Sequence, residues 1–201
     1  MRKAVQHLKL ADPVMAAIIA SVGPCRIQQR DADFHSLTRS IVHQQLSGKA
    51  AGTIFGRVTE AARCDPLTPK AILKIPVEKL RAAGLSQQKA SYVRDLAEKT
   101  RDKLVDFGSL AALTDDEVIA HLTQVKGVGV WTVQMLLMFA LDRRDVLPLA
   151  DLGIRNAIQK AYALETPPKP NEMEEIAAKW RPYRTVACWY LWRSLDGPAA
   201  L

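Results

Sequence analysis

The feature that most constrains this chain is a pair of glycines, Gly127 and Gly129, followed by an apolar run with no helix breaker before Asp142. Glycine adopts positive φ at little cost, so the pair predicts a tight hairpin between two helices. Backbone N–H groups at the start of a helix favour an anion. Because such amides read no base, this hairpin would position a nucleic-acid backbone without reading its sequence. The alternative is an ordinary helix-turn-helix connection.

Length and charge narrow the class of protein. The chain has 201 residues, of which 48% are hydrophobic, and this suffices for one domain of ordinary size or two small lobes. Its 28 basic and 21 acidic side chains give a net charge of +7. A basic balance of this kind favours a polyanionic partner.

The cysteines exclude several kinds of site. Cys25, Cys64 and Cys188 are odd in number, far apart and in no CxxC pattern. They therefore predict neither a disulfide framework nor a four-thiolate zinc or iron–sulfur site, and we expect reduced thiols. No apolar run reaches the roughly 18 residues that span a bilayer, and no signal-type apolar core follows Met1, so we expect a cytoplasmic protein of bacterial type, associated with the nucleoid through DNA.

Helical spacing of apolar residues and helix caps recur along the chain, whereas the alternation of a strand does not. The first twelve residues are basic and are expected to be loosely held. The predicted class is all-α. We expect helices at residues 13–22, 33–48, 50–62, 70–74, 77–83, 86–103, 114–123, 131–141, 152–163, 171–179 and 183–195.

Asp151 lies where an extended, proline-containing segment gives way to a helix. An Asp in this position is first of all a helix N-cap. The same position keeps a carboxylate anionic at neutral pH. Such an anion can stabilise positive charge on a sugar or orient a water molecule, and the two roles are compatible.

The segment 41–49 combines uncharged hydrogen-bonding side chains with one apolar side chain, just where a helix should end. At an exposed turn, Leu46 would act as a wedge and Gln45 as a hydrogen-bonding probe in a DNA groove. The alternative is that Leu46 belongs to the core and the glutamines are solvated.

Taken together, these segments resemble a known family, the helix-hairpin-helix DNA glycosylases with a Gly/Pro…Asp loop (the HhH-GPD superfamily). Within it, the resemblance is closest to alkylbase glycosylases of the 3-methyladenine DNA glycosylase II (AlkA) type, in their compact form. The matching segments, in family order, are SIVHQQLSGKAA, AAGLSQQKASYVRDLA, VKGVGVWTVQMLLMFAL, DVLPLADLGIRNA and WRPYRTVACWYLWR.

The resemblance implies an all-α, two-lobed fold without a β domain. Residues 33–150, including the hairpin at 122–141, would form a central region, and the N-terminal helix with residues 151–201 would complete the second lobe. Asp151 would be the catalytic carboxylate. Trp131 occupies the position of the nucleophilic lysine of members that also cut the strand, which implies a monofunctional enzyme.

The resemblance also implies a base pocket and a DNA surface. Trp131 and Trp192 would line the pocket and favour cationic bases, although both tryptophans being core residues is the alternative. No cofactor is expected apart from a monovalent cation at hairpin carbonyls near Val125 and Val128. Some relatives carry a larger side chain at the position of Ser47. The residues expected to contact DNA are Gln45, Leu46, Ser47, Lys49, Lys126, Gly127, Val128, Gly129 and Thr132.

The implied function is hydrolysis of the N-glycosidic bond of alkylated purines, of the 3-methyladenine and 7-methylguanine type, in duplex DNA during base excision repair. We expect a monomer without a membrane partner. One alternative is a non-catalytic helix-hairpin-helix module that binds DNA. Another is a glycosylase for other damaged bases, but those usually carry the hairpin lysine or a four-cysteine cluster, and this chain has neither.

Overall fold

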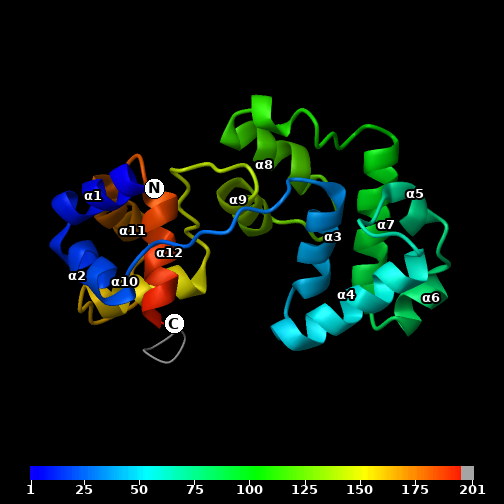
Figure 1. The fold of residues 1–201 in the computed structure, drawn as a ribbon, viewed down its shortest axis with the longest axis horizontal. Coiled ribbons are helices and arrows are strands. Elements are labelled where there is room, and N and C mark those ends of the chain that lie inside the picture. The colour runs from blue at the N-terminus through cyan, green and yellow to red at the C-terminus, as the bar shows by residue number, and fades with distance from the viewer. Residues whose placement is uncertain (196–201) are drawn as a thin grey trace. The chain divides into compact units, whose positions relative to one another are not determined.

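The computed structural model describes residues 1–195, and over that part of the chain it contains helices and no strand (Figure 1). The predicted all-α class is confirmed. Residues 196–201, the end of the predicted second lobe, lie outside the described residues. The helices are α1 (Arg2–Ala11), α2 (Pro13–Val22), α3 (Phe34–His43), α4 (Gly48–Ala62), α5 (Pro69–Leu73), α6 (Val77–Ala82), α7 (Gln87–Arg101), α8 (Asp115–Thr123), α9 (Val130–Phe139), α10 (Leu152–Ala161), α11 (Pro170–Ala177) and α12 (Arg184–Leu195), with 3-10 turns at Leu110–Ala112 and Ala178–Trp180.

The chain divides into two compact units. Among the described residues, unit 1 consists of Met1–Gln29 and residues 137–195, and unit 2 of Arg30–Leu136. The boundary lies within α9, earlier than the end at 150 expected for the central region. The loop that leads to Asp151 therefore belongs to the same unit as Asp151 itself.

Local capping explains where most helices begin. The side chains of Asp12, Ser86 and Asp151 accept hydrogen bonds from backbone N–H groups in the first turns of α2, α7 and α10. Thr114 and Glu117 form the predicted capping box at α8. These caps satisfy amides that a helix leaves unpaired, so the starts predicted from the sequence agree with the structure.

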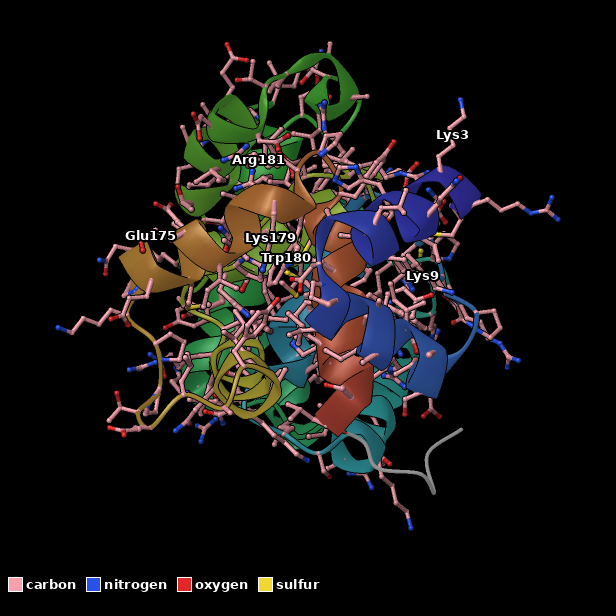
Figure 2. All side chains as sticks on the ribbon, turned by 90° about the vertical axis from the view of Figure 1, so that its left-hand side faces the viewer. Lys3, Lys9, Glu175, Lys179, Trp180 and Arg181 are labelled. Carbon is pink, nitrogen blue, oxygen red and sulfur yellow. The ribbon has the colours of Figure 1, made fainter. Side chains whose placement is uncertain are left out.

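The prediction that the first twelve residues are loosely held was wrong, because residues 2–11 form α1. Ala4 and Leu8, four residues apart on one face, are buried in unit 1, and α1 packs against α2 and α12. Its charged side chains, Lys3 among them, extend outward (Figure 2). Burial of one apolar stripe is therefore sufficient to order a segment that is basic overall.

Other helix bounds differ from the prediction as well. The helix expected over 33–48 ends at His43, and the next one begins at Gly48 instead of 50. The cause is Ser47, which caps α4, so residues 44–47 form a turn and no helix. α11 begins at Pro170, with proline at its first position, and Asn171 is inside the helix instead of capping it.

No helix within residues 1–195 combines the length and apolar character needed to cross a bilayer.

Candidate active site and nucleic-acid interface

In unit 1, Asp151 is held by two N–H donors. Its Oδ1 accepts from the backbone N–H of Ile154 at 2.7 Å and from the indole Nε1 of Trp192 at 3.0 Å. The residue is only 8% exposed. The carboxylate therefore has a fixed orientation at the N-terminus of α10, where the helix dipole favours a negative charge.

The loop before Asp151 is fixed to α12, the helix that carries Trp192. The Thr185 hydroxyl accepts from the Val146 N–H at 3.0 Å and donates to the Arg143 carbonyl at 2.6 Å. The Arg184 guanidinium pairs with Asp145 at 2.8 Å. One helix thus positions both the chain entering Asp151 and the indole that binds its carboxylate.

Gly153 makes room for the contact between Trp192 and Asp151. A Cβ at Gly153 would lie 3.1 Å from both Asp151 Oδ1 and the Trp192 indole nitrogen. The Trp192 ring also lies against Phe139, with ring centroids 5.9 Å apart. Trp192 is therefore half-buried and bonded to the carboxylate, an arrangement that neither the predicted pocket wall nor the core alternative describes completely.

In unit 2, the predicted hairpin joins α8 to α9, and only one of its two glycines needs a left-handed backbone. Gly127 has a φ of 76°, whereas Gly129 is not among the glycines with positive φ. The Val128 N–H donates to the Val125 carbonyl at 3.1 Å and closes the turn. Val128 is buried, so neither its side chain nor its amide is presented to an anion as the sequence led us to expect.

Gly127 is pressed against the ring of Tyr92 on α7. A Cβ at Gly127 would lie 2.1 Å from the ring. Replacing Gly127 with alanine is therefore expected to cost about 2 kcal/mol or more in unfolding free energy, because the new methyl group clashes and φ is unfavourable. At Gly129 a Cβ meets no atom within 4 Å. Gly129→Ala is the matched control, and chemical denaturation that gives equal losses for both variants would contradict this account.

The hairpin is also fastened to α7 through Lys126. Its backbone N–H donates to Asp95 Oδ2 at 2.9 Å, while Lys99 pairs with the same carboxylate at 2.7 Å. Burial opposes ionisation of Asp95, but these partners outweigh it and hold its pKa below the ordinary value. The Lys126 side chain is 69% exposed, with its ammonium 3.8 Å from Asp95, and leaves a positive charge at the hairpin surface.

The turn 44–47 carries the two side chains predicted to probe a groove. Leu46 is 39% exposed, so the alternative that it belongs to the core is wrong. Gln45 is exposed and has a φ of 56°. Ser47 accepts from the Ala50 N–H at 3.4 Å as the cap of α4, and Lys49 is exposed in the first turn of that helix.

The first turn of α9 is partly open to solvent. Trp131 is 43% exposed and Val130 49% exposed, so the core alternative fails for Trp131. The helix is therefore less buried at its start than its apolar sequence predicts. Thr132, also expected at the DNA surface, is only 7% exposed, and its side chain faces the interior of the protein.

Over residues 1–195, no group of three or more histidine, cysteine or acidic side chains is arranged to hold a metal ion. The hairpin carbonyls suit a monovalent cation chemically, because they are neutral oxygen donors. The Val125 carbonyl accepts a hydrogen bond from the Val128 amide, and a carbonyl oxygen has two lone pairs.

Comparison with known proteins gives one family. Residues 38–182 match the model of the "HhH-GPD superfamily base excision DNA repair protein". DNA-3-methyladenine glycosylase 1 of Schizosaccharomyces pombe is 37% identical, over 96% of this chain and 87% of that protein. The alkylbase DNA glycosidase-like protein mag2 of the same yeast is 30% identical, over 96% and 92%.

Two solved structures similar to this chain are also of 3-methyladenine DNA glycosylases or glycosidases. The S. pombe 3-methyladenine DNA glycosylase Mag1, solved in complex with abasic DNA, has a TM-score of 0.85 and 33% identity, and the match covers 99% of both chains. A DNA-3-methyladenine glycosidase of Bacillus halodurans has a TM-score of 0.86 and 33% identity, covering 98% of this chain and 90% of that one.

Proposed function

The chain belongs to the HhH-GPD superfamily of base excision DNA repair proteins and is a DNA glycosylase, and we propose that it excises alkylated purines from duplex DNA with Asp151 as its catalytic carboxylate. The observation that carries the proposal is the buried Asp151, oriented by the Ile154 amide and the Trp192 indole. The relatives named 3-methyladenine glycosylases support this class of substrate.

The chemistry suits a single carboxylate. A purine methylated at N3 or N7 is cationic and leaves with the electron pair of the N-glycosidic bond, which neutralises it. As the bond breaks, C1′ of the sugar becomes an oxocarbenium-like cation. A fixed carboxylate beside it supplies several kcal/mol of electrostatic stabilisation. Water then adds its oxygen to C1′ and loses a proton, so the products are the free base and an abasic site.

Trp131 supports hydrolysis without strand cleavage. An indole cannot form a Schiff base with the sugar, so this position offers no nucleophilic amine. Lys126 pairs with Asp95 on α7 and serves as a surface charge. We therefore propose that the enzyme is monofunctional. We also propose that it is a monomer, that the hairpin and the turn 44–47 form its DNA surface, and that a monovalent cation at the hairpin carbonyls has a structural role.

The test is release of free base from methylated duplex DNA. The proposal expects methylpurines in solution and intact abasic strands until alkali is added. Strand breaks without alkali would contradict the monofunctional assignment. DNA binding with no base release would instead favour a non-catalytic DNA-binding module.

The contact between Trp192 and Asp151 makes a separate prediction. Trp192→Phe retains a ring against Phe139 but removes the N–H that orients the carboxylate. We expect base release to slow about tenfold at unchanged DNA affinity, because small misplacements of a reacting group are costly. Single-turnover assays with a methylated purine and with a neutral purine lesion measure the effect.

The matched control is Trp189→Phe, the same change on the same helix, where the indole packs against Tyr190. It should leave the rate nearly unchanged. Equal slowing in both variants would mean that α12 packing alone is affected. A loss confined to the cationic base would assign Trp192 to cation–π recognition of the base, without a role in orienting Asp151.

A further inference from the structure

One face of α7 supports both of the loops proposed to meet DNA. Lys89 reaches the end of α3 beneath the turn 44–47, Tyr92 packs on Gly127, and Asp95 binds the Lys126 amide. These three residues are spaced at intervals of three along the helix, so they lie on one side of it. All of these contacts are within unit 2.

Lys89 binds the backbone where α3 ends and the turn 44–47 begins. Its ammonium donates to the Val42 carbonyl at 2.7 Å and to the Gln44 carbonyl at 2.5 Å. These oxygens are at the C-terminal end of α3, where carbonyls lack partners within the helix. Lys89 is half-buried, and burial lowers its pKa. The contact therefore allows the chain to leave the helix and adopt positive φ at Gln45, the next residue.

Gln44 joins the turn to the hairpin directly. Its side-chain Nε2 donates to the Gly127 carbonyl at 2.8 Å, across 83 residues of sequence. Gly127 is the residue pressed against Tyr92. The turn and the hairpin are thus bonded to each other, and each is separately fastened to α7.

We infer that Lys89 and Gln44 are positioning residues that fix the turn 44–47 to the hairpin at Gly127, so that both engage DNA as one rigid unit. The inference rests on the proposed function. Contacts between the hairpin and DNA phosphates would carry no sequence information, whereas Gln45 and Leu46 reach the place of a displaced nucleotide only from a fixed position. The preference for DNA with a displaced or missing nucleotide over undamaged DNA therefore depends on the bonding of the turn to the hairpin. The affinity for undamaged DNA does not depend on it.

The experiment compares affinity for a duplex that holds a stable abasic-site analogue with affinity for the undamaged duplex. Lys89→Met keeps the unbranched side chain but removes the donor. We expect the ratio of the two affinities to fall about tenfold, the size expected when one hydrogen-bonded contact to DNA is lost. Affinity for undamaged DNA should change no more than in the control.

Arg94→Met is the matched control. Arg94 lies on the same helix, is similarly half-buried and also donates to a backbone carbonyl, that of Ile75, at 3.1 Å. The Arg94→Met substitution removes one positive charge, as Lys89→Met does, but it does not alter a contact with the turn 44–47. Its affinity ratio should stay within about twofold of the unchanged protein, since loss of one phosphate-attracting charge weakens both duplexes alike.

Gln44→Met tests the coupling without removing a charge or a buried ammonium. The same fall in the affinity ratio is expected, with unchanged folding. An unaltered ratio in Lys89→Met and Gln44→Met, or an equal fall in Arg94→Met, overturns the inference. Base release by the unchanged protein is measured in parallel. If it is absent, the proposed function fails, and the affinity ratios still decide whether the turn and hairpin are coupled.

Discussion

Replacing Asp151 with asparagine is expected to slow release of methylated purines by at least about two orders of magnitude while leaving DNA affinity nearly unchanged. Asparagine also caps helices, and its side-chain oxygen can accept from the Ile154 amide and the Trp192 indole. The geometry is retained, whereas the negative charge beside C1′ is lost. Single-turnover release of base, measured together with binding to undamaged duplex, separates these effects.

Asp33→Asn provides the control for this change. Asp33 also caps a helix, accepting from the Ser36 amide at 2.7 Å at the start of α3, and it belongs to the other unit. Its variant should release base at the rate of the unchanged protein. If Asp151→Asn retained full activity, Asp151 would be only a helix cap and the catalytic carboxylate would have to be sought elsewhere.

Helix starts could be predicted from the sequence because a cap is a local interaction. The Asp12, Thr114 and Asp151 side chains each bind an amide two or three residues away, so a short window contains the whole cause. α1 was missed for the opposite reason. Its order depends on distant partners, among them the Lys179 carbonyl, which lies within hydrogen-bond distance of the His7 ring 172 residues earlier.

In the candidate site, too, features that depend on neighbouring residues could be predicted from the sequence, and contacts between distant residues could not. Asp151 stood out as a carboxylate at a helix start, and the family resemblance gave it a role. The indole bond from Trp192, 41 residues away, and the bond from Gln44 to Gly127 leave no trace in spacing or periodicity. The sequence marked Gln45 and Leu46 by their chemistry, but the neighbour that holds them in place, Lys89, resembles any lysine on an amphipathic helix.

The second large effect is expected on stability, at Asp12. This carboxylate is fully buried and accepts from the Val14 amide at 2.9 Å, the Trp180 indole at 2.8 Å and the Tyr162 hydroxyl, with the Lys179 ammonium at 3.3 Å (Figure 2 labels Lys179 and Trp180). Asp12→Ala leaves these donors without their acceptor and removes the cap of α2. We expect a loss of about 3 kcal/mol or more in unfolding free energy, measured by chemical denaturation.

The size of that loss should depend on pH in a defined direction. Burial opposes ionisation of Asp12, but hydrogen bonds from Trp180, Tyr162 and Val14 and the charge of Lys179 outweigh it, so its pKa lies below the ordinary value of 3.8. A carboxylate with a lowered folded-state pKa stabilises the fold above its unfolded-state pKa, and this stabilisation disappears as pH falls through the folded-state value. The difference between the unchanged protein and Asp12→Ala should therefore be largest near neutral pH and shrink below about pH 4. Asp33→Ala, which loses only a cap, should cost about 1 kcal/mol at neutral pH. An equal cost for both variants would mean that the buried donors around Asp12 find other partners, and that this cluster does not hold α1, α2 and the Ala178–Trp180 turn together.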